Sequence, residues 1–262
     1  MNHSTPQLSE LFRRAGATRG DTVFVHSSLF HIGPLEPIAI PDMPRVLYDA
    51  LATTVGPEGT IAAPTFTFSF CDGATFHRQH SPSEKMGALA EYIRQRPRAI
   101  RSPHPIQSIA ACGANAAVLT NRWSPDAFRP GSPFDALVQA NALLLFIGCD
   151  IEAASLIHWA ESRVKVPYRY WKRFHGTCIS GEDARRRTVE MFVRRRDWAS
   201  EVRCAPVGQA LRDHDQLRQF QLGRGHLLAC RAQPFVHHAM RLLMRDPLCL
   251  IAEAPTPTGE RP

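Results

Sequence analysis

Short apolar blocks alternate along the chain with amphipathic stretches, and this pattern predicts strands and helices in turn. Strands are expected at residues 21–25, 60–63, 108–112 and 142–147, and the last of them is continuously apolar. A continuously apolar strand is typical of a parallel sheet that helices cover on both faces. Helices are expected at residues 8–15, 44–55, 83–94 (with Ser83 as N-cap), 115–120 and 153–163. The alternation predicts an α/β fold with a central, mostly parallel sheet flanked by helices.

The pattern changes in the C-terminal half of the chain, where turn residues separate pairs of strand-like segments. Residues 176–194 surround the turn 181–183, and residues 217–232 surround the turn 222–225. Such pairs predict antiparallel hairpins, which fall in a region of about residues 174–233. A last helix is expected at 235–244. We expect one α/β domain over residues 1–253 and a flexible tail, rich in Pro and Thr, at 254–262.

The composition suits a packed protein of the cytoplasm. Hydrophobic residues make up 44% of the 262 residues and charged residues 21%. The seven cysteines are an odd number and form no CxxC pair, which argues against a disulfide framework and against a thiolate metal site. The N-terminus has no apolar signal core, and no apolar run approaches the ~20 residues of a membrane span. A cytoplasmic protein without a membrane partner is therefore expected.

The net charge of +7 leaves several kinds of partner open, among them nucleic acid and anionic cofactors. Runs of three consecutive arginines occur only at 185–187 and 194–196. These runs suit solvated strand or turn faces, or a nucleic-acid surface, but no nucleic-acid-binding motif accompanies them. We therefore expect no nucleic-acid partner.

Candidate chemistry follows the strands, because ligands of open α/β sheets bind beyond the carboxyl ends of the strands. The turn His26-Ser27-Ser28 comes after the first strand, and a helix that bears His158 and Glu161 comes after the strongest one. Residues three apart share a helix face, so the carboxylate can fix the tautomer of the imidazole. A general base for an amine needs this arrangement, although a surface ion pair has the same spacing.

A second candidate is the basic, proline-rich segment 94–108, whose arginines and backbone amides can hold phosphates. An ordinary basic loop would look the same. The chain contains no Walker loop, Rossmann fingerprint or serine-hydrolase elbow. His237 and His238 are adjacent on a helix and point apart, so no metal site is expected there.

Five segments, in this order, resemble the aminoglycoside 3-N-acetyltransferase family. They are GDTVFVHSSL (20–29), VGPEGTIAAPTFTF (55–68), MGALAEYIRQRPRAIRSPHPIQSIAACG (86–113), GSPFDALV (131–138) and SLIHWAE (155–161). The resemblance implies a two-part α/β fold that binds acetyl-CoA in a cleft and acetylates a primary amine of an aminoglycoside or related amino sugar. It implies neither a metal nor a covalent enzyme intermediate.

The resemblance also assigns roles to residues. The histidine of the H-x-x-E helix, His158, is the implied base, with Glu161 as its carboxylate. The residues implied to hold the coenzyme are Ser27, Ser28 and Leu29, along the pantetheine arm, and Arg101, Ser102, His104 and Ser108, in the R-S-x-H-P-x-x-S stretch.

One departure from the family pattern concerns the turn before the base helix. Family members often have Asn-Thr there, whereas this chain has Ala154-Ser155. Ser155 keeps a hydroxyl that can hydrogen-bond the thioester carbonyl.

The identity of the amine stays open. Acids near the presumed cleft are few, with Asp72 and Glu161 as the expected substrate contacts. A polycationic aminoglycoside favours an acidic pocket, whereas a nucleotide-linked sugar suits a basic surface. Another acyl donor, such as malonyl-CoA, and a homodimer are also left open.

Overall fold

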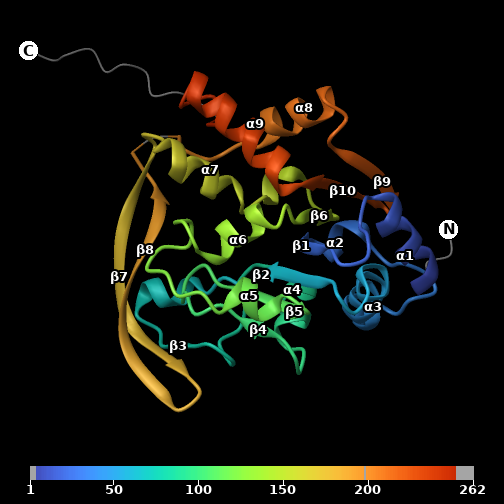
Figure 1. Cartoon of the computed structure of the whole chain (residues 1–262), viewed down its shortest axis with the longest axis horizontal. Helices are drawn as coiled ribbons and strands as arrows, with labels where there is room; N and C mark the ends of the chain where they lie inside the picture. The colour runs from blue at the N-terminus through green and yellow to red at the C-terminus, as the bar shows by residue number, and fades with distance from the viewer. Residues whose placement is uncertain (1–3, 198, 252–262) are drawn as a thin grey trace, which may run out of the picture.

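The computed structural model describes residues 4–197 and 199–251, and a seven-stranded mixed sheet forms its centre (Figure 1). The strand order is β4-β5-β2-β1-β6-β10-β9. The strands are β1 (Thr22–Ser27), β2 (Thr60–Pro64), β4 (Ile100–Arg101), β5 (Ile109–Gly113), β6 (Leu143–Ile147), β9 (Arg218–Leu222) and β10 (Gly225–Arg231).

The strand directions correct the expectation of a mostly parallel sheet. Strand β1 is parallel to both neighbours, β2 and β6. The pairs β2–β5, β5–β4, β6–β10 and β10–β9 are antiparallel. Two hairpins, β4–β5 and β9–β10, form the two ends of the sheet, and a hairpin connection forces its strands to be antiparallel. A continuously apolar strand shows that both faces are buried, and the buried strand β6 is parallel to β1 but antiparallel to β10, so burial did not fix strand direction here.

Helices cover both faces of the sheet, which explains why its central strands are continuously apolar. Val23 and Val25 of β1 face one apolar cluster, whereas Phe24 faces the other. The first face carries α1 (Thr5–Arg14), α3 (Met43–Val55) and α4 (Ala88–Arg94). The second face carries α5 (Ala116–Thr120), α6 (Pro133–Gln139), α7 (Ile157–Val164), α8 (Ala205–Asp213) and α9 (Ala232–Arg245).

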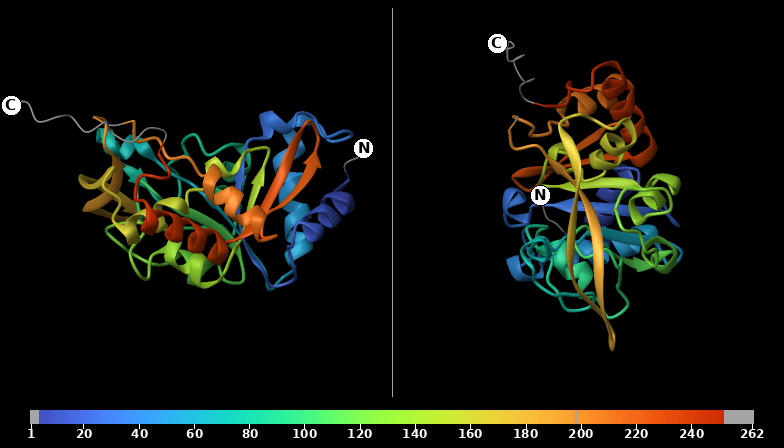
Figure 2. Two further views of the ribbon diagram at one scale, coloured as in Figure 1. Left: turned by 90° about the horizontal axis from the view of Figure 1, so that it is seen from above. Right: turned by 90° about the vertical axis from the view of Figure 1, so that its left-hand side faces the viewer.

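A three-stranded sheet lies beside the central one and contains β3 (Phe76–His77), β7 (Arg169–Ser180) and β8 (Asp183–Arg194). Strands β7 and β8 pair along their whole length, and their turn extends past the neighbouring elements (Figures 1 and 2). Gly176 lets this hairpin pass close to Phe70, because a Cβ atom at position 176 would lie 2.6 Å from the ring. Both predicted hairpins are confirmed, but β9–β10 belongs to the central sheet and not to a common hairpin region.

The remaining elements are short: α2 (Leu29–Ile32), η1 (Ile40–Asp42), η2 (Phe68–Asp72) and η3 (Ile151–Ala153). The prediction of Ser83 as a helix N-cap is wrong, because α4 begins at Ala88 after Gly87. Ser83 instead donates hydrogen bonds from its backbone N and Oγ to Glu91.

The predicted tail at 254–262 lies outside the described residues. None of the described helices is long and apolar enough to cross a membrane.

Candidate active site

A cleft of about 590 Å³ opens where the carboxyl end of β1 meets the segment before α4. Ser27, Ser28 and Leu29, which the family resemblance implies to hold the coenzyme, line it together. The other residues that line it are His26, Phe30, Pro64, Lys85, Met86, Gly87, Ala88, Cys149 and Ala153. Lys85 is the only Lys or Arg in this lining, which is otherwise mostly apolar or hydroxyl-bearing.

Two glycines allow the backbone to close around this cleft. Gly148 has φ +67°, and a Cβ atom there would lie 2.5 Å from the Ser28 carbonyl oxygen. Gly87 has φ +86°, and a Cβ atom there would lie 2.7 Å from the Ser27 carbonyl oxygen. The Ser28 backbone N donates to the Ile147 carbonyl over 2.8 Å. Only glycine fits such contacts at positive φ, so the turn after β1 has a fixed position.

His26 connects the cleft to the start of α7. Its Nε2 lies 3.0 Å from Ser155 Oγ and 3.3 Å from the Ser155 backbone N. The ring stacks on Phe146, and burial lowers the pKa of His26 to about 3, so the imidazole is neutral at physiological pH. The sequence predicted His26 in a turn after the first strand and gave it no role, whereas His26 and Ser27 are the last two residues of β1. Its partner is 129 residues away along the chain, and no local pattern encodes such a pair.

His158 and Glu161 form a short hydrogen bond on α7, as their spacing predicted. His158 Nδ1 donates to Glu161 Oε2 over 2.6 Å, and the same oxygen makes a 2.7 Å ion pair with Arg169 Nε. The Glu161 side chain is fully buried, whereas that of His158 is 25% exposed. The surface ion pair that was the alternative interpretation is therefore excluded. Arg169, at the start of β7, was not among the sequence candidates.

Burial and neighbouring charges shift the pKa values of His158 and Glu161. Desolvation and the Arg169 guanidinium lower the pKa of His158, and they outweigh the Glu161 carboxylate, which raises it. Desolvation raises the pKa of Glu161, but the charges and hydrogen bonds of His158 and Arg169 keep that pKa below its usual value. At neutral pH the imidazole is thus the free base, with Nδ1 held by Glu161 and Nε2 left for another partner. His158 does not line the 590 Å³ cleft; its ring lies 6.0 Å from that of Phe128.

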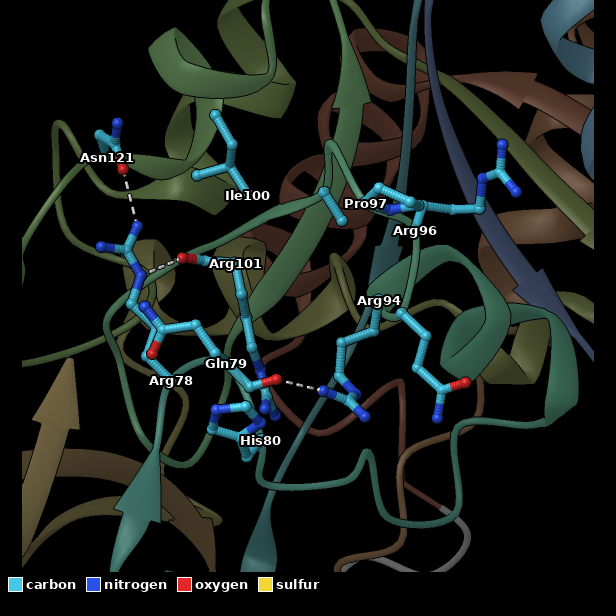
Figure 3. Close-up of a pocket in the computed structure, with 11 residues that line it drawn as sticks. Arg78, Gln79, His80, Arg94, Arg96, Pro97, Ile100, Arg101 and Asn121 are labelled. Atoms are coloured by element: carbon cyan, nitrogen blue, oxygen red, sulfur yellow. Dashed lines mark hydrogen bonds between the residues drawn. The ribbon is translucent and has the colours of Figure 1, made fainter. Parts of the chain in front are cut away.

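The R-S-x-H-P-x-x-S stretch is buried, and its polar groups bond to the protein. Arg101 Nε donates to Ser108 Oγ over 2.8 Å, and its Nη2 donates to Thr67 Oγ1 over 2.7 Å. Ser102 Oγ accepts from the Ile109 backbone N, and His104 Nδ1 accepts from that of Gln107. Burial lowers the pKa of Arg101 to about 9 and that of His104 to about 4. None of the four residues lines the 590 Å³ cleft, whereas Arg101 lines a separate, basic cavity (Figure 3).

Asp72 is exposed at the end of η2 and lines neither of these two cavities. The structure therefore places Ser27, Ser28 and Leu29 in one cleft with His26, and His26 bonds to Ser155. The His158–Glu161 pair lies on α7 outside the lining of that cleft, and Asp72 is separate from both. Across residues 4–197 and 199–251, no three His, Cys, Asp or Glu side chains gather in a way that could hold a metal ion.

Comparison with known proteins points to one family. The sequence model of the aminoglycoside 3-N-acetyltransferase family matches residues 24–244. Aminoglycoside N(3)-acetyltransferase VII of Streptomyces paromomycinus is 31% identical over 64% of this chain and 68% of its own length. Aminoglycoside N(3)-acetyltransferase IV of a Salmonella species is 27% identical over 90% of this chain and 85% of its own length.

Solved structures share the fold of this chain. AAC-IIIb, in a binary complex with CoASH, superposes with a TM-score of 0.81 at 23% identity, over 97% of this chain and 99% of its own. The aminoglycoside acetyltransferase AAC(3)-IVa gives 0.79 at 25% identity, over 97% and 93%. This chain is an enzyme that belongs to the aminoglycoside 3-N-acetyltransferase family.

Proposed function

We propose that this enzyme transfers an acetyl group from acetyl-CoA to a primary amine of an aminoglycoside or related amino sugar, with His158 as general base. The observation that carries the proposal is the 2.6 Å hydrogen bond from His158 Nδ1 to the buried Glu161 carboxylate. Related proteins support the choice of substrates. AAC-IIIb was solved with CoASH, AAC-VIa with sisomicin, and a histidine-to-alanine mutant of AAC(3)-IVa with apramycin.

The coenzyme arm fits the 590 Å³ cleft. Ser27, Ser28 and Leu29 lie at its wall, where hydroxyl and backbone groups can bind the amides of a pantetheine chain. We assign Arg101, Ser102, His104 and Ser108 a supporting role, because their hydrogen bonds hold the adjacent loop to β2 and β5. Another acyl-CoA with a longer acyl group, such as malonyl-CoA, is the alternative donor.

The proposed reaction begins with the neutral imidazole. Glu161 holds the proton on Nδ1, so the lone pair of Nε2 takes a proton from the amine as the nitrogen attacks the thioester carbon. The new C–N bond forms a tetrahedral intermediate, and its collapse breaks the C–S bond and releases CoA. The thiolate of the leaving CoA then takes the proton from the His158 imidazolium, which returns the imidazole to its neutral form. Glu161 stabilises the imidazolium that forms in between.

We also propose that Ser155 binds the thioester oxygen. Its backbone N and its Oγ both approach the single lone pair of His26 Nε2, at 3.3 and 3.0 Å. The backbone N–H can satisfy that lone pair alone, which frees the hydroxyl to donate to an oxyanion.

The test is the His158→Gln variant, with His237→Gln as a matched control on the exposed side of α9. Thiol release from acetyl-CoA is measured with a panel of amines, and coenzyme binding is measured by calorimetry. A general base contributes about 10²–10⁴-fold, so kcat should fall by that factor in His158→Gln while acetyl-CoA still binds. Retention of full activity would reject the base assignment.

A further inference from the structure

Two cavities that share no lining residue with the candidate active-site cleft meet at Arg78. The larger, of about 580 Å³, is lined by Arg78, Gln79, His80, Arg94, Gln95, Arg96, Pro97, Ala99, Ile100, Arg101 and Asn121 (Figure 3). The smaller, of about 260 Å³, lies under the β7–β8 hairpin, and Arg78, Trp123, Arg185 and Arg187 are among the residues that line it. The larger cavity has no carboxylate in its lining, and the smaller has one, Asp183, against three arginines, so both present mostly positive charge.

The charge of these arginines is only partly neutralised by the protein. Arg94 is paired with Glu91 over 2.5 Å, and Arg185 with Asp183 over 3.1 Å. Among the described residues, by contrast, no carboxylate lies within ion-pair distance of Arg78, Arg101 or Arg187. Glu84 and Glu91 act on Arg101 only through space.

Arg101 is the most costly of these charges to bury. Its residue is 5% exposed, and its guanidinium binds only neutral oxygens, those of Ser81, Thr65, Thr67 and Ser108. A buried cation without a counter-ion is destabilising unless a ligand supplies the opposite charge. The cavity beside it is the place where an anion can do so.

Arg78 is positioned to bind such an anion. Its Nε donates to the Arg101 carbonyl, and its Nη2 donates to Asn121 Oδ1 over 2.6 Å. These two bonds fix the guanidinium plane, and no described protein group accepts from Nη1. A fixed guanidinium with free N–H groups favours the oxygens of a phosphate. In the second cavity the Arg187 guanidinium lies 4.5 Å from the centre of the Trp123 ring.

We propose that these two cavities form a phosphate-binding site, with Arg78 at their junction, that takes a diphosphate group. The diphosphate can belong to the coenzyme or to a separate phosphate ester, since both offer the same oxygens. The coenzyme source rests on the proposed function; the anion site itself does not. This site also gives Arg187 a role, since it is the member of the 185–187 run whose guanidinium contacts Trp123.

The experiment uses the full chain, inorganic pyrophosphate as probe, and the variants Arg78→Gln and Arg186→Gln. Arg186 is an exposed control from the same arginine run, and it lines neither cavity. Calorimetry should show that Arg78→Gln weakens pyrophosphate binding about tenfold or more, as loss of a charge-assisted hydrogen bond implies, and that Arg186→Gln leaves it unchanged. The proposal is overturned by no binding to the wild type, or by equal binding to wild type and Arg78→Gln. Arg187→Gln, on the exposed hairpin, provides a second variant should Arg78→Gln unfold.

Two further measurements identify the source of the phosphate. A coenzyme source predicts that pyrophosphate competes with CoA and that Arg78→Gln weakens binding of CoA but not of pantetheine, which has no phosphate. A separate phosphate ester predicts that pyrophosphate binds to the CoA-saturated enzyme with unchanged affinity. Neither readout requires acyl transfer, so failure of the proposed function and failure of the anion site are separate results.

Discussion

Replacing Glu161 by glutamine tests the proposed base without changing the size of the side chain. The variant removes the negative charge that His158 Nδ1 and Arg169 Nε share at 2.6 and 2.7 Å. The amide oxygen of glutamine can still accept one hydrogen bond. It cannot stabilise an imidazolium as a carboxylate does, and the Arg169 guanidinium stays buried beside the ring.

The size of the effect follows from that single hydrogen bond. A hydrogen bond to a charged group contributes about 1.5–3 kcal/mol, and each 1.36 kcal/mol corresponds to about tenfold in rate. The variant Glu161→Gln should therefore lose about 10- to 150-fold in kcat. Its free energy of unfolding should fall by about 1–3 kcal/mol, because Arg169 loses a charged partner in a buried site.

The pH dependence of kcat in Glu161→Gln should shift in a defined direction, which a general structural defect would not produce. The reaction needs neutral His158, so kcat rises with pH through the lowered pKa of this histidine, below its ordinary 6.5. Glu161 raises that pKa and Arg169 lowers it, so removal of the carboxylate should move the acid limb to still lower pH. Thiol release measured from pH 4.5 to 8 checks this, with Glu182→Gln in the exposed β7–β8 turn as control. An acid limb that stays in place or moves to higher pH would refute the reasoning.

Two further predictions concern the cleft and the buried histidines. The variant Gly148→Ala places a Cβ atom 2.5 Å from the Ser28 carbonyl at φ +67°, so the KM for acetyl-CoA should rise severalfold in thiol-release assays; an unchanged KM would argue against the coenzyme assignment. The pKa values of His26 (about 3) and His104 (about 4) lie below the unfolded value near 6.5, so the unfolded state binds more protons between these limits. The stability they contribute is complete above about pH 6.5 and should be lost on acidification by about 1.4 kcal/mol per pH unit for each histidine. Urea unfolding between pH 7 and 5 measures the slope of stability against pH, and His104→Gln should lower that slope by up to about 1.4 kcal/mol per pH unit; equal slopes in both proteins would contradict the assignment.

The sequence predicted the features that depend on local pattern. Each central strand is apolar because helices cover both of its faces, so the strands were found at nearly their observed positions. The Ser27–Leu29 turn was found because strand ends share one edge of a sheet, and the His158–Glu161 contact because residues three apart share a helix face. The hairpins were found from their turn residues.

Features that depend on distant contacts were not predicted. Strand direction is set by the connections, and short apolar strands look alike in either direction. The Arg169–Glu161 ion pair joins β7 to α7, and Arg169 lies in a stretch that was not predicted as a strand. Burial of the Arg101 stretch was also missed, because a basic, proline-rich sequence resembles an exposed loop. In each case the deciding partner is remote in the sequence.

Burial, followed by the arrangement of charges around Glu161, explains how a histidine beside a carboxylate can have a lowered pKa. Glu161 Oε2 contacts both His158 and Arg169. The Arg169 guanidinium therefore offsets part of the negative charge of Glu161 before the imidazole takes a proton. With the imidazole neutral, the three side chains carry no net charge, and a single proton makes the group +1. Arg169 therefore makes the imidazole a weaker base but keeps more of it unprotonated at neutral pH. For an acceptor that reacts only as a free amine, an unprotonated base within a neutral group suits the proposed reaction better than a strong base that is already charged.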